Sequence, residues 1–132
     1  TKVIDNGNYI FYNGHNYRYK DSMTSILFMG VDKDELGTVK NVVGTGGQAD
    51  ALYLIAIDTD NGVTTTFQIS RNTMVDIDLY NTAGDFIRTE NNQICLSYAY
   101  GDGKETSAEN TVRSVRRLFY GLPVAQSYTA WY

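Results

Sequence analysis

The fold of this 132-residue chain is decided by residues 48–72, QADALYLIAIDTDNGVTTTFQISRN. Residues 51–58 and 63–70 are rich in apolar and β-branched side chains, which favour strands. The connection between them ends in Asn61-Gly62, a typical hairpin turn. We therefore predict two antiparallel strands, with Asp50 before the first and Arg71 after the second.

A second apolar run, SILFMGVD, occupies residues 25–32. It is short and continuously apolar, as in a central strand covered on both faces. If it lies antiparallel to 51–58, Asp32 and Asp50 meet at one sheet edge. Two carboxylates repel unless a cation lies between them, and Mg²⁺ prefers oxygen ligands. The alternative is that both aspartates cap loop backbone.

Arg71 ends the strand that pairs with the one begun by Asp50. A guanidinium at a strand end can hold phosphate oxygens through two hydrogen bonds. A surface ion pair with Asp76 or Asp78 is the alternative. This edge of the sheet is therefore a candidate site for a metal ion and a phosphate.

The rest of the chain divides into recognisable elements. Asn13-Gly14 predicts a hairpin of residues 9–12 and 16–20, and 33–49 reads as a loop. Residues 74–90 are interpreted as a surface excursion with a short strand at 75–79. NNQICLSYAYG, residues 91–101, predicts a short helix, and 124–132 a last strand.

The clearest helix is predicted over residues 106–120. Thr106 and Glu109 form a capping-box pattern, and Gly121 and Pro123 end the helix. Glu109 and Arg113 can pair one turn apart. One face is apolar: Ala108, Val112, Val115, Leu118 and Phe119. The fold class expected from this order is α/β, a mixed sheet covered by helices in an α-β-α sandwich.

The charge and the composition of the chain narrow the classes of protein that it can belong to. The net charge is −4 without a block of basic residues, which disfavours nucleic-acid binding. Arg113, Arg116 and Arg117 are interpreted as a solvated helix face. The eleven tyrosines favour strands, and they could also form a surface for sugars or lipid. The single Cys95 is expected to be a buried, inert thiol.

A phosphate-binding loop and a membrane-spanning segment are both disfavoured by the sequence. The glycines of GTGGQAD, residues 44–50, precede a strand, whereas a phosphate loop follows one and opens a helix. No run approaches the ~20 apolar residues of a membrane span, and no signal peptide is visible.

Five ordered motifs resemble the LytR-CpsA-Psr family of bacterial cell-wall proteins. They are ILFMGVD, DALYLIAID, QISRNTMVDI, QICLSYAYGDG and VRRLFYGLPVAQSY, spread over residues 26–128. The family pattern is a strand ending in G-[VI]-D, a loop ending in R-x-D-T, a strand ending in S-[IL]-P-R-D-T, an I-N-x-A-Y-x-x-G-G helix, and a helix running into G-[IV]-P-[IV]-x-x-Y.

The resemblance implies a function. Such proteins are held by an N-terminal membrane helix, with the domain on the extracellular face of the membrane, often in Gram-positive bacteria. With Mg²⁺ assisting, they transfer a polyisoprenyl-pyrophosphate-linked glycopolymer, such as teichoic acid or capsule, to peptidoglycan. The anchor would lie outside this chain.

The resemblance also implies roles for individual residues. The metal-binding aspartates fall on Asp32 and Asp50, and the phosphate-binding arginine on Arg71. Asp50 and Arg71 would be catalytic, with Arg71 holding the pyrophosphate in line for attack by an acceptor hydroxyl. Gln48 and Gln93 complete the expected pyrophosphate site. An apolar tunnel for the lipid would draw on Tyr98, Leu118 and Phe119, which could equally be ordinary core residues.

The chain departs from the family pattern at three positions. Gln48 replaces an arginine, Asn72 replaces an aspartate, and Gln93 stands where a basic residue is common. The motifs cover the first half of the family domain, with residues 1–24 as a hairpin lead-in and 25–132 as the core. The remaining strands and arginines are expected beyond Tyr132 or in another polypeptide, and exposed edges could favour a homodimer.

The leading hypothesis is a partial transferase domain that is weak by itself. One alternative is a non-catalytic module that binds polyprenyl phosphate or pyrophosphate, which Gln48 and Asn72 favour. The other is a regulatory or structural protein of the cell envelope.

Overall fold

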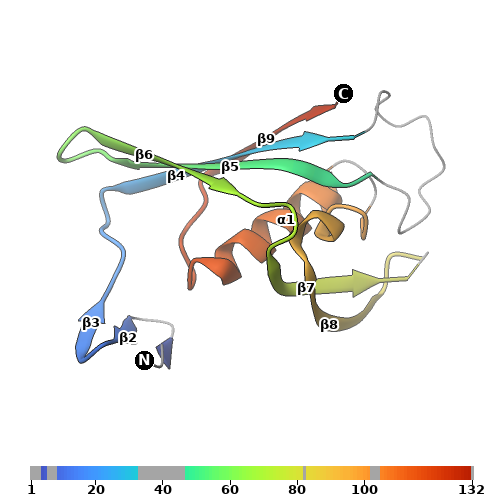
Figure 1. The fold of residues 1–132 in the computed structure, drawn as a ribbon, viewed down its shortest axis with the longest axis horizontal. Coiled ribbons are helices and arrows are strands. Elements are labelled where there is room, and N and C mark those ends of the chain that lie inside the picture. Colours follow the sequence, from blue (N-terminus) through green and yellow to red (C-terminus); the bar gives the residue numbers. More distant parts are fainter. Residues whose placement is uncertain (1–3, 6–8, 33–46, 82, 102–104, 132) are drawn as a thin grey trace.

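The structure is a computed structural model that describes residues 4–5, 9–32, 47–81, 83–101 and 105–131 (Figure 1). These residues form three sheets, of three, four and two strands. Most of the loop predicted at 33–49 lies outside the described residues.

The small N-terminal sheet confirms the predicted hairpin. It contains β1 (Ile4–Asp5), β2 (Ile10–Tyr12) and β3 (His15–Tyr17), all antiparallel. Asn13 and Gly14 form the turn with φ of 52° and 80°. Both turn positions of this hairpin type require positive φ, which explains why Asn-Gly predicts it.

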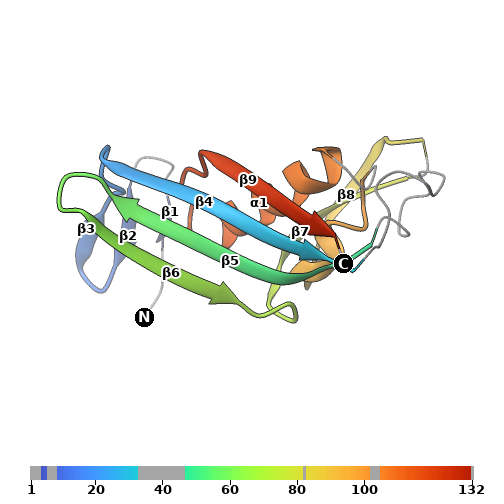
Figure 2. The same ribbon diagram turned by 90° about the horizontal axis from the view of Figure 1, so that it is seen from above.

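The central sheet is mixed, as the sequence predicts. Its strand order is β6 (Val63–Ile69), β5 (Ala49–Asp58), β4 (Met23–Val31) and β9 (Gln126–Trp131). β4 pairs antiparallel with β5, and β5 antiparallel with β6, whereas β9 runs parallel to β4. Figure 2 shows the four strands side by side from above.

One face of this sheet is covered. The helix α1 (Glu105–Leu118) and the hairpin of β7 (Met74–Tyr80) and β8 (Phe86–Gln93) lie below the sheet in Figure 1. The core between the two layers is aliphatic and includes Leu27, Val31, Leu52, Leu54, Ile77, Ile94 and Val115.

The other face of the sheet is open among the described elements. Phe28, Tyr53 and Tyr128 are 39%, 40% and 51% exposed, and the Phe28 and Tyr128 rings stack with centroids 5.4 Å apart. The expectation that residues 25–31 are covered on both faces is therefore wrong for the described part of the chain. Among the described residues, the layers are the mixed central sheet and, beneath it, α1 with the β7–β8 hairpin.

Two intermediate segments also differ from expectation. The short strand predicted at 75–79 is confirmed as β7, but the surface excursion predicted at 74–90 is instead the hairpin of β7 and β8, and Val75, Ile77 and Leu79 belong to the core. The short helix predicted at 91–101 is a 3₁₀ helix, η1, of four residues, Ile94–Ser97. The first three residues of the predicted segment, 91–93, belong instead to β8 and pair with β7.

The long helix α1 lies close to its predicted range of 106–120. Thr106 is inside the helix, so it is not the predicted N-cap. The predicted apolar face is confirmed: Val115 is buried, and Ala108, Val112, Leu118 and Phe119 pack against the core. Gly121, with φ of 87°, donates its N–H to the Arg116 carbonyl at 2.7 Å and closes the helix.

Asn110 is a fully buried polar residue on α1. Its side-chain amide donates to the backbone carbonyls of Ser97, Asp78 and Tyr100, at 2.7, 3.1 and 3.3 Å. Buried carbonyls need such donors, because an unpaired polar group in the interior is costly. Asn110 thus joins the helix, β7 and the end of η1.

Replacing Asn110 with alanine is expected to lower the free energy of unfolding by about 2–3 kcal/mol, because buried carbonyls lose their donor. Urea unfolding followed by circular dichroism measures the change. Glu109→Ala, at the neighbouring exposed position, should leave stability within about 0.5 kcal/mol of wild type. Equal effects of the two substitutions would contradict this role of Asn110.

Asp78 is a buried carboxylate that ties β7 to α1. Its Oδ2 lies 2.9 Å from an Arg113 nitrogen, and its Oδ1 lies 3.0 Å from an Arg117 nitrogen and accepts from Thr89 at 2.7 Å. Arg113 and Arg117 are partly exposed, as a solvated helix face requires, but both also pair with Asp78, which the sequence did not indicate. Arg113 turns to Asp78, whereas the sequence suggested Glu109.

These partners set the protonation of Asp78. Burial alone would raise the pKa of this carboxyl, but the hydrogen bonds from Arg117 and Thr89 and the charges of both arginines outweigh burial, so the pKa lies below its ordinary value. A group with a depressed folded pKa stabilises the fold above its unfolded pKa of about 3.9, and that contribution is lost as the pH falls through the folded pKa.

Asp78→Asn is therefore expected to cost about 2 kcal/mol at pH 7 and to weaken the loss of stability below about pH 4. Urea unfolding at several pH values between about 2.5 and 7 measures both effects. The matched control is Asp85→Asn, at an exposed position. An acid profile that keeps its wild-type slope in Asp78→Asn would contradict this account.

Candidate phosphate and metal site at one sheet edge

The pairing of β4 with β5 brings both predicted aspartates to one edge. Val31 lies opposite Ala49, and Gly30 opposite Ala51, so Asp50 is the extra residue of a β-bulge. Bulges redirect side chains and are common beside functional sites. The predicted antiparallel arrangement of these strands is confirmed.

Asp32 is joined to the residue before β5. Its backbone N–H donates to the Gln48 carbonyl at 3.3 Å, and its Oδ1 accepts the Gln48 backbone N–H at 2.7 Å. Asp32 therefore caps loop backbone, which is the alternative to metal binding that the sequence left open for this residue. The same contact fixes its carboxylate at the edge that carries Asp50.

Arg71 reaches this edge from the end of β6. One terminal nitrogen lies 2.8 Å from Asp50 Oδ1, and the other donates to Gln48 Oε1 at 2.6 Å. The proposed alternative, an ion pair of Arg71 with Asp76 or Asp78, is wrong, because Arg71 pairs with Asp50. Asp78 is held by the helix arginines, and Asp76 accepts a hydrogen bond from the Asn91 amide at 3.3 Å. The Arg71 side chain is 43% exposed and that of Asp50 is 16% exposed, so solvent reaches mainly the arginine.

Cys95 lies against the same guanidinium. Its thiol is fully buried, as predicted, but its Sγ is 3.8 Å from the second terminal nitrogen of Arg71 and 3.9 Å from Gln93 Oε1. The Cys95 backbone N–H also donates to the Arg71 carbonyl at 3.2 Å. The thiol is therefore a neighbour of the site, a contact that the apolar sequence around Cys95 did not indicate.

These surroundings favour the charged form of Arg71. The hydrogen bond with Cys95 raises the pKa of the guanidinium most, against the lowering effect of burial, and the charges of Asp50 and Asp32 add to the rise. The structure thus brings together five of the residues predicted for the site or its surroundings: Asp32, Gln48, Asp50, Arg71 and, through Cys95, Gln93.

The carboxylates alone do not make a complete metal site. Among the described residues, no three His, Cys, Asp or Glu side chains lie close enough to hold an ion. Mg²⁺ is commonly bound by one or two carboxylates together with waters and substrate phosphates. Asp32 and Asp50 match that donor set only if a phosphate supplies further oxygens.

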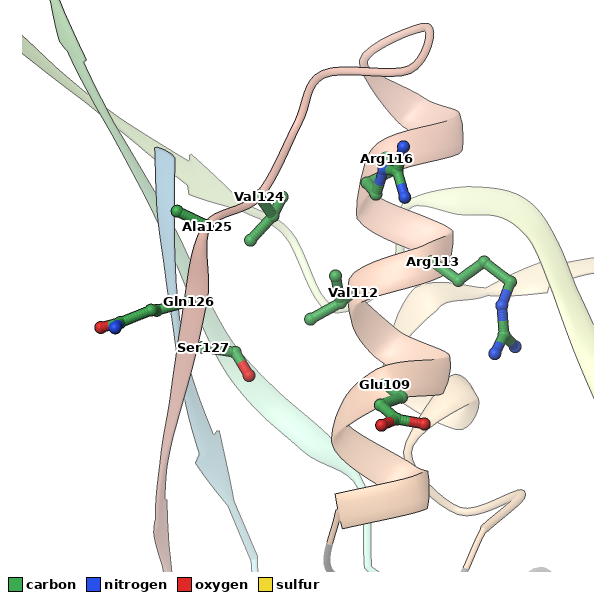
Figure 3. Close-up of a pocket in the computed structure, with 8 residues that line it drawn as sticks. All are labelled: Glu109, Val112, Arg113, Arg116, Val124, Ala125, Gln126 and Ser127. Carbon is green, nitrogen blue, oxygen red and sulfur yellow. The ribbon is translucent and has the colours of Figure 1, made fainter. Parts of the chain in front are cut away.

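The residues predicted for a lipid tunnel lie in or beside the core. Tyr98 is fully buried, and Leu118 and Phe119 are half-buried, with Phe119 edge-on to Phe67 at 5.4 Å. A cleft of about 350 Å³ does separate α1 from β9, but Val112, Val124 and Ala125 give it its apolar lining (Figure 3). The tunnel role of the three residues stays a prediction.

The fold and this edge define a class of protein: a mixed-sheet domain with a guanidinium and two carboxylates at one end of its central strands. The protein-family model described as "LytR_cpsA_psr family" matches residues 5–124 of the chain. The chain belongs to the LytR-CpsA-Psr family.

Solved structures support this assignment. TagV of Bacillus subtilis is 28% identical with a TM-score of 0.57, and the match covers 85% of this chain and 37% of that one. A structure described as the transcriptional regulator yvhJ, also from B. subtilis, is 25% identical with a TM-score of 0.56, over 85% and 41% of the two chains.

Lin1025 of Listeria innocua is 24% identical, with a TM-score of 0.50, over 83% of this chain and 35% of that one, which supports the fold alone. The chain thus spans about two fifths of the first solved structures that it matches. Among curated protein sequences, none matches it. In the described parts of the chain, no helix is long and apolar enough to cross a membrane.

The position of Cys95 gives a test of the site geometry. Arg71→Ala is expected to speed alkylation of this single cysteine by iodoacetamide about tenfold, because the side chain over the thiol is removed and opening becomes easier. Mass spectrometry follows the reaction. Arg88→Ala, which removes an exposed arginine from β8, should leave the rate unchanged, and an equal rate in both variants would contradict the contact.

Proposed function

We propose that this domain binds the pyrophosphate of a polyisoprenyl-linked glycan at Arg71 and takes part in transferring that glycopolymer to peptidoglycan. The observation that carries the proposal is the position of Arg71 between Asp50, Gln48 and Cys95 at the edge where Asp32 also lies. Family membership and the likeness to TagV support it.

The guanidinium is held in one orientation and still has donors to offer. Its contacts with the described side chains of Asp50, Gln48 and Cys95 involve one Nη1 proton and both Nη2 protons, which leaves the Nε proton and the second Nη1 proton. These two protons point in different directions, so each can donate to a separate phosphate oxygen. In the transfer, Arg71 offsets the negative charge that grows on the leaving phosphate as an acceptor hydroxyl attacks.

Asp32 and Asp50 would hold Mg²⁺ beside the pyrophosphate. The ion, when bound, supplies positive charge that neutralises the diphosphate. Without it, two carboxylates facing a dianion would repel the substrate. Gln93, which contacts the Cys95 thiol, would lie at the rim of the same site.

The other parts of the proposal concern the whole protein. We place the domain on the extracellular face of the cytoplasmic membrane, anchored by a helix outside this chain, with residues 1–24 as a lead-in and 25–132 as part of an α-β-α sandwich. The edge strands β6 and β9 could pair with another copy or with further strands.

Gln48 favours a second candidate, a module that binds polyprenyl pyrophosphate without catalysis. Its Oε1 accepts a hydrogen bond from Arg71, so at this position the side chain adds no positive charge to the clamp. Among the described residues at this edge, Arg71 is the cation that could offset a leaving group.

Binding of geranylgeranyl pyrophosphate, a short polyisoprenyl pyrophosphate, tests the site by calorimetry with and without Mg²⁺. Arg71→Ala is expected to weaken binding about tenfold to a hundredfold, because a charged hydrogen-bond pair is lost. Asp50→Ala should remove the dependence on Mg²⁺. The control Arg88→Ala removes the same charge elsewhere and should bind as wild type does.

Binding that neither Arg71→Ala nor Asp50→Ala weakens would overturn the site assignment. Transfer assays with the full-length protein separate the two candidates. Transfer of a labelled glycopolymer to peptidoglycan supports the transferase, and tight binding without transfer supports the module.

A further inference from the structure

A groove lined by tyrosines lies between the N-terminal sheet and the end of α1. Its volume is about 650 Å³, and its lining, which we name the tyrosine groove, is Ile10, Tyr12, Tyr17, Arg18, Tyr19 and Tyr120. The Tyr19 hydroxyl donates to the Phe119 carbonyl, which ties the segment after β3 to the residue after α1. The two walls of the groove are therefore connected.

A second hollow lies beside it. This arginine hollow has a volume of about 340 Å³ and is lined by Arg113, Arg116, Arg117, Tyr120 and Gly121. Tyr120 lines both spaces, so the tyrosine groove and the arginine hollow lie next to each other. Figure 3 shows Arg113 turned away from β9 and Arg116 one turn further along α1.

The arginines carry more positive charge than the fold requires. Asp78 fixes Arg113 and Arg117 at 2.9 and 3.0 Å, and among the described residues no carboxylate lines the hollow, so its three guanidiniums exceed Asp78 by two positive charges. Cations at a helix C-terminus also stabilise the helix dipole, but that needs about half an elementary charge. In a chain of net charge −4, this excess marks a surface for an anion.

The tyrosines present open ring faces. Tyr12, Tyr17 and Tyr120 are 43%, 51% and 46% exposed, although each ring is a large apolar surface. Such rings combine apolar faces with a polar hydroxyl, which suits a ligand that is apolar on one side and polar at its edge. A sugar ring, with C–H groups on its faces and hydroxyls around them, has this character.

We propose that the tyrosine groove and the arginine hollow together bind an anionic glycan, with sugar rings on the tyrosines and a phosphate or carboxylate at Arg116. Charge complementarity selects this ligand over a neutral lipid or a neutral sugar. Arg116 is exposed at the mouth of the hollow, whereas Arg113 and Arg117 are oriented by Asp78 and add to the local positive charge.

This surface is separate from the Arg71 edge. β9 begins opposite Ile26 and ends opposite Val31, next to Asp32. Since α1 leads into the start of β9, its C-terminal end lies toward the other end of β4. The inference does not rest on pyrophosphate binding, because neither groove nor hollow includes Arg71, Asp50 or Asp32.

Calorimetry with three polymers tests the proposal: phosphomannan, unphosphorylated mannan and polyphosphate. Phosphomannan is expected to bind at least about tenfold more tightly than either of the others, because only it offers both sugar rings and phosphates. Equal binding of mannan would overturn the role of the arginines, and equal binding of polyphosphate would overturn the role of the tyrosines.

Substitutions test whether phosphomannan binds at the tyrosine groove and the arginine hollow. Tyr17→Ala and Arg116→Ala should each weaken phosphomannan binding about tenfold and leave geranylgeranyl pyrophosphate binding unchanged. The controls are Tyr128→Ala, at the same 51% exposure on β9, and Arg88→Ala on β8. Phosphomannan binding that Tyr17→Ala and Arg116→Ala leave intact, or that the controls weaken equally, would overturn the proposal.

Discussion

The register between β4 and β5 is the constraint on which the rest of this structure depends. It places Leu27 and Leu54 opposite each other in the core and, a few residues further along, puts Asp32 beside Gln48. A slip of one residue would move every core side chain to the open face. The apolar pattern of the two strands therefore fixes the core and the position of the candidate site at once.

Part of this arrangement could be predicted because its signals are local. The Asn-Gly turn and the apolar run predict that β5 and β6 pair, and the pairing carries Asp50 and Arg71 to one edge. The bulge that redirects Asp50 has no comparable signal. β8 was missed for a related reason: most of its residues, FIRTENNQ, are exposed, so no apolar alternation marks it.

The contacts that were not predicted join residues far apart in sequence. Asp78 meets Arg113 and Arg117 across 35 and 39 positions, and Cys95 meets Arg71 across 24. In each case the local sequence supports a simpler interpretation, a charged helix face or a buried thiol. On α1, Asn110, Thr111 and Ser114 are more buried than most of the apolar face, because they pair with carbonyls and hydroxyls of β7 and η1.

The two ends of the covered face differ in their electrostatics. At the Arg71 edge, two carboxylates outweigh one guanidinium, so an anion needs an accompanying cation there. At the end of α1, three guanidiniums outweigh Asp78, so an anion needs none. A chelator that removes divalent ions should therefore weaken ligand binding at the first end and leave the second unaffected, while added salt weakens both by screening. That difference follows from the charges of the described residues alone, and it allows the two surfaces to be distinguished in the unmodified protein.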